Sequence, residues 1–233
     1  MSAQASDSVS VRLPCRLRAT ISVLDASGSR IVAYRDDCAS DAARFHKWMA
    51  DAVLPAATGA RTRDVENAPP WPALLKLHKT AAEGFPITIA QWRDVLGPVY
   101  HALFVAAFPY DQGYAKAYAS ALEFAGTNRK MIEDAFGSAE AYAQYYGDTN
   151  TTAIRDFGCR AHAAAHTRLA APAYASCDLG RICGSGLPMR LRALLFSVAV
   201  EDRPQLSSRL LGGLLEAFST RPDQLAQNSG TIR

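Results

Sequence analysis

Two imidazoles and a thiol recur at helical spacing in the segment Cys159-Arg-Ala-His162-Ala-Ala-Ala-His166. With about 100° of rotation per residue, these three side chains and that of Arg155 fall on one side of a helix. We name Arg155, Cys159, His162 and His166 the polar stripe. The apolar residues of the segment fall on a separate sector, which we expect to pack against the protein: Ile154, Phe157, Ala161, Ala165 and Leu169.

Zinc is one ligand that the polar stripe can bind. Cys159, His162 and His166 offer three ligands from adjacent turns, and Cys177 or Cys183 can complete a tetrahedral shell from the segment that follows. With water as the fourth ligand, the metal would lower the pKa of that water to about 7 and support hydrolysis. Two features oppose zinc. The two later cysteines are further apart than paired ligands usually are, and the Glu of helical metalloprotease motifs is absent.

Three other roles for these residues remain open. Cys159 or Cys177 can act as a nucleophile with a histidine as its base. Arg155, with the two histidines beside it, can contact an anion, above all a phosphate. The third role is structural, because a cysteine in an Ala-rich helix commonly packs as a small apolar residue. The glycine-containing segment after Cys183 lacks the Lys and Ser/Thr of a phosphate-binding P-loop.

Composition indicates one folded domain. The chain has 233 residues, of which 49% are hydrophobic and 20% are charged, enough to bury a core. No stretch approaches the roughly 18 apolar residues of a membrane span. The N-terminus lacks the features of a secretory signal, so we expect an intracellular, cytoplasmic protein whose five cysteines are reduced.

The basic residues are mostly arginine. The formal net charge is +3, and 20 of the 25 basic residues are Arg. The segment 151–233 holds ten Arg and no Lys against six acidic residues. Arginine suits bidentate contact with phosphate, although this balance falls short of the basic patch of a dedicated nucleic-acid binder.

An N-terminal β-hairpin over 9–36 follows a polar segment, 1–8, that we expect to be a flexible arm. Apolar and polar residues alternate from Val11 to Val23, which predicts a strand with Arg12, Arg16 and Arg18 on a basic face. A turn at 25–29 and a return strand over 30–35 complete the hairpin. Because an isolated hairpin is marginally stable, it must pack on helices or pair with another chain.

The remainder, 40–219, has helical periodicity and ends in a polar tail, 220–233, that we also expect to be flexible. Pro55 is expected to end the first helix, Thr88 and Gln91 form a capping box, and Pro98 should kink or split the helix that contains it. The predicted helices are 40–53, 72–82, 88–108, 110–126, 128–136, 138–147, 148–172, 189–200 and 202–219. The sequence therefore predicts a mainly α, Ala-rich helical bundle forming a single domain over 9–219. Its aromatic residues either pack between helices or stack nucleobases.

The segment Thr152-Ala-Ile-Arg155-Asp156-Phe157-Gly-Cys159-Arg-Ala-His162-Ala resembles a helix in the coat proteins of filamentous RNA viruses. The resemblance covers about a dozen residues and carries over only Arg155, which in that family forms a buried pair with an Asp. Here Asp156 is adjacent to Arg155 and projects from another side of a helix, and the family's downstream Phe-Asp-Phe block is absent. The resemblance implies an RNA-coating subunit whose arms link its neighbours.

We therefore expect a non-enzymatic, self-assembling structural protein that forms homo-oligomers, binds RNA through Arg side chains and needs no cofactor. Its place would be the cytoplasm, or the virion if it is a coat protein. The alternative is a zinc-binding protein or metal-dependent hydrolase built on Cys159, His162 and His166.

Overall fold

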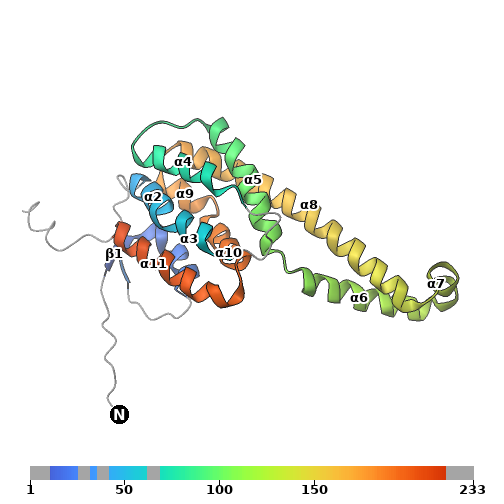
Figure 1. Cartoon of the computed structure of the whole chain (residues 1–233). Coiled ribbons are helices and arrows are strands. Elements are labelled where there is room, and N and C mark those ends of the chain that lie inside the picture. The colour runs from blue at the N-terminus through green and yellow to red at the C-terminus, as the bar shows by residue number, and fades with distance from the viewer. Residues whose placement is uncertain (1–10, 26–31, 36–41, 62–68, 219–233) are drawn as a thin grey trace, which may run out of the picture.

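The computed structural model of the protein describes residues 11–25, 32–35, 42–61 and 69–218. Figure 1 shows a body of packed helices from which one long helical hairpin projects. The mainly α fold is confirmed. No helix within the described residues combines the length and the apolarity needed to cross a bilayer. The segments 1–8 and 220–233, predicted as flexible arms, lie outside the described ranges.

The N-terminal elements correct the predicted β-hairpin over 9–36. They are β1 (Val11–Pro14), the 3-10 turn η1 (Cys15–Leu17), α1 (Arg18–Leu24) and β2 (Val32–Arg35). The two strands pair in parallel, with Val11 opposite Val32, so β2 is not the return strand of a hairpin. The predicted strand therefore ends at Pro14, and the chain continues as helix.

Helix replaces strand after Pro14 because the apolar residues there pack as a helical face. Leu17, Ile21 and Leu24 are buried, and their spacing of four and three places them on one side of a helix. Ala19, which a strand would place on the same face as Leu17 and Ile21, is exposed. α1 packs against the last two helices of the chain, so tertiary contacts decide between the two periodicities.

A single helical run crosses the proline that was expected to end it. The run consists of α2 (Ala42–Trp48), the π-helical segment η2 (Met49–Val53) and α3 (Leu54–Gly59). Pro55 lies in the first turn of α3, directly after the π-helical segment. A missing N–H is tolerated in a first turn, so the prediction that Pro55 ends the helix is wrong.

The other helices of the body follow the predicted pattern, except for one short helix over Leu179–Gly184, where a loop was expected. They are α4 (Trp71–Ala82), α5 (Ile89–Ala107), α9 (Leu179–Gly184), α10 (Leu187–Ser197), the 3-10 turn η3 (Val200–Asp202) and α11 (Arg203–Phe218). The capping box at Thr88 and Gln91 is confirmed. α5 continues through Pro98 as one helix. α11 buries Leu206, Leu210, Leu214 and Phe218, which recur at intervals of four along the helix.

The projecting hairpin is formed by α6 (Tyr110–Thr127), α7 (Arg129–Phe136) and the first half of the long helix α8 (Ala139–Ala175). Ser138 caps α8 through the N–H of Ala141, as the sequence indicates. The predicted break at Gly147 is absent. A Cβ at Gly147 would lie 2.9 Å from Cε2 of Tyr114, so this glycine permits close approach of α6 rather than ending a helix.

Small residues hold the two long helices of the hairpin together. The buried positions of α6 and of the first half of α8 repeat at intervals of four: Ala117, Ala121 and Ala125, and Ala143, Gly147 and Thr151. Small side chains let the helix axes approach closely along this face. The second half of α8 returns into the body along α5.

Adjacent glycines in α11 give a matched test of this packing. A Cβ at Gly213 would lie 2.5 Å from Cβ of Ala52 and 3.5 Å from the indole of Trp48, whereas a Cβ at Gly212 meets nothing within 4 Å. We expect Gly213→Ala to lower the free energy of unfolding by about 1–3 kcal/mol through overpacking. Gly212→Ala should raise it by up to about 1 kcal/mol through helix propensity. Urea unfolding followed by circular dichroism measures both, and equal effects would contradict the packing described.

Candidate functional site

Two residues of the polar stripe, Cys159 and His166, are buried, and the apolar sector expected to pack is exposed. His166 faces α5, where its ring contacts that of Phe104. Ile154, Phe157 and Leu169 are exposed, with Phe157 exposed by 74%. The predicted packing side of this helix is therefore wrong. Large apolar side chains face solvent where small and polar ones were expected.

Arg155 is half-buried where the hairpin joins the body. Its Nε donates to Oδ1 of Asp156 at 2.9 Å, and its guanidinium lies 5.7 Å from the ring centroid of Tyr110. The long arginine side chain thus reaches the carboxylate that the sequence placed on another side of the helix. The positive charge of Arg155 is paired with a carboxylate of this chain, so Arg155 is less available to bind an external anion.

Cys159 and Cys177 are not arranged as a shared zinc site. Burial raises the pKa of the Cys159 thiol, and the nearby Arg155 charge only partly opposes this effect. A protonated thiol is a poor ligand and a poor nucleophile. Because α8 is continuous from Cys159 to Ala175, the helix end that precedes Cys177 lies roughly 24 Å further along its axis. Among the described residues, no group of three or more His, Cys, Asp or Glu is placed to hold a metal ion.

The two imidazoles of the stripe meet the same ring of α5 but differ in exposure. The rings of His162 and His166 lie 6.0 and 5.1 Å from that of Phe104. His162 is exposed, whereas His166 is buried and its Nδ1 has no hydrogen-bond partner among the described residues. Burial lowers the pKa of His166, and the positive charge of Arg190 lowers it further. His166 is thus a neutral packing group at pH 7.

The three arginines predicted on one basic face of an N-terminal strand lie instead on three different elements, β1, η1 and α1. The side chain of Arg12 lies outside the described part of the structure. Arg16, on η1, lies across Gly180 of α9, where a Cβ would be 2.6 Å from its Nη1. Arg18 is exposed on α1.

A buried guanidinium that the sequence analysis did not identify lies between α5, α8 and α10. Arg190 is only 4% exposed. It donates to the carbonyl oxygen of Ser185, to Oγ of Ser185 at 3.0 Å and to the hydroxyl of Tyr174 at 3.4 Å. The rings of Tyr100 and Tyr174 lie 5.4 and 5.7 Å from it. No carboxylate is among these partners, so within the described residues neutral groups compensate the charge, and Nε of Arg190 has no hydrogen-bond partner there.

A sequence signal for this burial existed. Arg190 lies three residues after Leu187 and four before Leu194, and both leucines are buried. A residue at those offsets shares their helix face. An arginine in register with core leucines therefore indicates a buried charge with partners in the fold.

Beside Arg190, two histidines form a buried pair. Nδ1 of His46 and Nδ1 of His78 are 2.9 Å apart, so one ring donates and the other, which must be neutral, accepts. The rings of Phe45, Trp92 and Tyr174 surround the pair. Centroids of neighbouring rings in this cluster, the two imidazoles included, are 5.0–6.0 Å apart. Burial lowers the pKa of His46 to about 4 and that of His78 well below its ordinary value. This cluster is a polar core rather than an open site.

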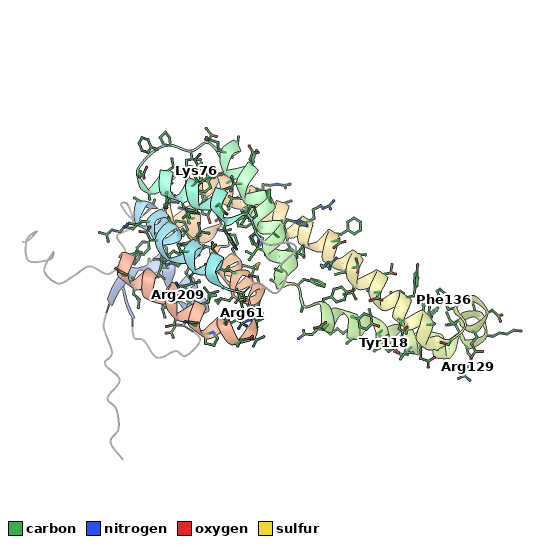
Figure 2. The ribbon with its side chains drawn as sticks, in the orientation of Figure 1. Arg61, Lys76, Tyr118, Arg129, Phe136 and Arg209 are labelled. Atoms are coloured by element: carbon green, nitrogen blue, oxygen red, sulfur yellow. The ribbon has the colours of Figure 1, made fainter. Side chains whose placement is uncertain are left out.

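The projecting hairpin carries much of the exposed apolar surface. Seven of the thirteen exposed large apolar side chains in the described residues belong to α6, α7 or residues 139–157 of α8: Phe124, Met131, Phe136, Tyr145, Tyr146, Ile154 and Phe157. We name these seven the exposed hairpin residues. Figure 2 shows Phe136 near the end of the hairpin that is far from Arg61 and Arg209 of the body. A hairpin of two helices buries only the faces that meet. In the part of the chain that the structure describes, these side chains remain exposed, with only partial cover from one another and from Tyr142.

No protein-family model, curated protein or solved structure matches this chain. The function accordingly has to be inferred from the side chains that the fold exposes and from those that it buries.

The buried histidine pair makes stability depend on pH. The pKa of His46 falls from 6.5 to about 4 on folding, so between these values the unfolded chain binds more protons than the folded one. We expect the free energy of unfolding to be highest above pH 7 and to fall as the pH drops through this window. At pH 5, His46 alone should account for a loss of about 2 kcal/mol. Urea unfolding at about pH 7.5 and about pH 5 measures it. His78→Gln should reduce this pH dependence and the exposed His162→Gln should preserve it; equal slopes in both variants would refute the assignment.

Replacing Arg190 tests the buried guanidinium. Lysine keeps the charge but cannot span the Ser185 and Tyr174 acceptors with a planar fork. Arg190→Lys should therefore lower the free energy of unfolding by about 2 kcal/mol or more. The exposed neighbour Arg192→Lys should change it by less than about 0.5 kcal/mol. Thermal and urea unfolding measure both variants, and similar stability for the two would show that the buried contacts contribute nothing.

Proposed function

We propose that this protein is a non-enzymatic, self-assembling structural protein that binds RNA through arginine side chains. Its assembly contact is the hairpin, which packs through the exposed hairpin residues against a neighbouring copy. The observation that carries this proposal is the projection of a helical hairpin whose large apolar side chains are exposed in the described structure.

The exposed hairpin residues support a contact between copies on energetic grounds. Phe157 and Ile154 are exposed by 74% and 55% on consecutive turns of α8. Burying a side chain of this size gains about 1.5–3 kcal/mol. Large exposed apolar surfaces on monomers commonly mark interaction sites. A projecting element also reaches a neighbour without requiring the two bodies to touch.

The arginine content supports an RNA ligand. Arginine supplies 20 of the 25 basic residues, and its planar fork matches phosphate geometry. The exposed basic residues in the described part of the body include Arg16, Arg18 and Arg192. The buried, protonated thiol of Cys159 and the neutral His166 favour a structural role for the polar stripe over a catalytic one.

Light scattering coupled to size-exclusion chromatography tests assembly, with absorbance at 260 and 280 nm recorded to detect bound nucleic acid. We expect the full-length protein to form oligomers whose mass rises with concentration. Phe157→Glu should shift the equilibrium toward monomer by at least about 10-fold, because it places a charge in the apolar contact.

The control for this variant is Phe85→Glu. Phe85 is 60% exposed but lies between α4 and α5, outside the hairpin. This variant should assemble as the unmodified chain does. A monomer free of nucleic acid at all concentrations, or equal effects of the two substitutions, would rule out the proposed hairpin contact.

A further inference from the structure

A pocket of about 440 Å³ opens between α1, α10 and the start of α11. Its volume lies within the range of small-molecule sites, about 300–1,000 Å³. Val23, Leu195 and Phe196 contribute apolar lining, and Arg192 and Arg203 contribute guanidinium groups. The pocket thus combines an apolar surface with two cations.

The positive charge of this pocket is not balanced by its own lining. No carboxylate is among the lining residues that the structure describes. Glu201 and Asp202, which precede Arg203 in the chain, are held instead by Arg61 at 3.2 and 3.1 Å. The pocket therefore favours an anionic ligand.

Arg203 retains unused hydrogen-bonding capacity. Its Nη2 reaches the carbonyl oxygen of Phe196 only at 3.4 Å. Its Nε is buried and finds no acceptor among the described residues. A guanidinium carries five N–H donors. Because Nε is buried, the donors available to an incoming oxyanion are those of Nη1 and Nη2.

Both cations lie close to one aromatic ring. Phe196 is 41% exposed, and the guanidinium carbons of Arg203 and Arg192 lie 4.7 and 5.6 Å from its ring centroid. Nucleobases stack both on aromatic rings and on arginine planes. An acidic peptide would use the two cations but would gain little from this stack.

Two hydroxyls complete the lining. Oγ of Ser22 donates to the carbonyl oxygen of Arg18, and Oγ of Ser207 donates to that of Leu24. Because each hydroxyl already donates its single proton, it can take part in a further hydrogen bond only as an acceptor. A ribose 2′-hydroxyl is a donor of the required kind.

We propose that this pocket binds one nucleotide unit of single-stranded RNA, with its phosphate against Arg192 and Arg203 and its base stacked beside Phe196. This inference rests on the proposed function, because it names the place where the chain contacts RNA. It assigns that contact to α10 and α11 rather than to the polar stripe of α8.

Fluorescence anisotropy with the full-length protein and a labelled oligouridine of about 20 nucleotides tests the cations. The double variant Arg192→Gln/Arg203→Gln should bind at least about 10-fold more weakly at fixed salt. The slope of log affinity against log salt concentration should fall by about 0.7, because the two arginines together neutralise one phosphate of the single strand.

The matched control is Arg129→Gln/Arg209→Gln, which removes the same charge from exposed arginines on the hairpin and on α11 that do not line the pocket (Figure 2). It should weaken binding by less than about 3-fold. Arg192→Gln alone, at an exposed position, provides a variant whose fold is preserved even if Arg203 proves necessary for folding. Circular dichroism checks each variant.

Phe196→Ala tests stacking separately from charge. It should weaken RNA binding by roughly 10-fold without changing the salt dependence. Unlabelled RNA should displace the labelled oligouridine, and polyglutamate of similar length should not.

The outcomes separate the two proposals. If the unmodified chain binds no RNA, the RNA part of the proposed function fails together with this inference. If RNA binds but the pocket and control double variants weaken it equally, only the pocket assignment fails. Displacement by polyglutamate as effective as that by RNA would assign the pocket to acidic peptides and overturn the inference.

Discussion

Arg190 places a full positive charge inside the helical body, and the surrounding elements are arranged to compensate it. Removing a charge from water costs several kcal/mol unless polar partners replace the water. Those partners come from three places: Ser185 at the turn before α10, the hydroxyl of Tyr174 near the end of α8, and the ring of Tyr100 on α5. Arg190 is therefore compensated only when α5, α8 and α10 have assembled around it.

Tyr174 extends this dependence to the N-terminal half of the chain. Its ring contacts the buried pair formed by His46 and His78, which come from α2 and α4. The polar core thus joins the early helices to the end of α8 through one side chain. Because α8 is anchored at that end and runs for 37 residues as a single helix, its first half extends beyond the body, where α6 is its main packing partner. The projecting hairpin follows from this anchoring.

The sequence predicted the helices better than their packing. Thr88, Ser138 and the leucines of α11 carry local signals, a cap or a repeat, and the structure agrees with them. Pro55 and Gly147 carry equally strong stop signals, yet a π-helical turn and the close approach of Tyr114 keep both residues helical. Helical spacing grouped the residues of α8 by face but did not indicate which face is buried, because alanines and a neutral histidine pack as well as large apolar residues when the neighbouring helix is close.

Because helical spacing does not show which side chains are buried, the sequence indicated a candidate site on the polar stripe, whereas the structure indicates one on α10 and α11. Chemistry-bearing residues are conspicuous in a sequence, but a fold can neutralise them, as Asp156 neutralises Arg155 and burial neutralises His166. A binding surface consists of exposed apolar side chains and charged groups that the fold itself leaves without packing or charge partners. Among the described residues, two such sets are exposed apolar side chains on the hairpin and the guanidinium groups of Arg192 and Arg203. They lie on different helices, so the proposed contact between copies and the proposed RNA contact would use separate surfaces.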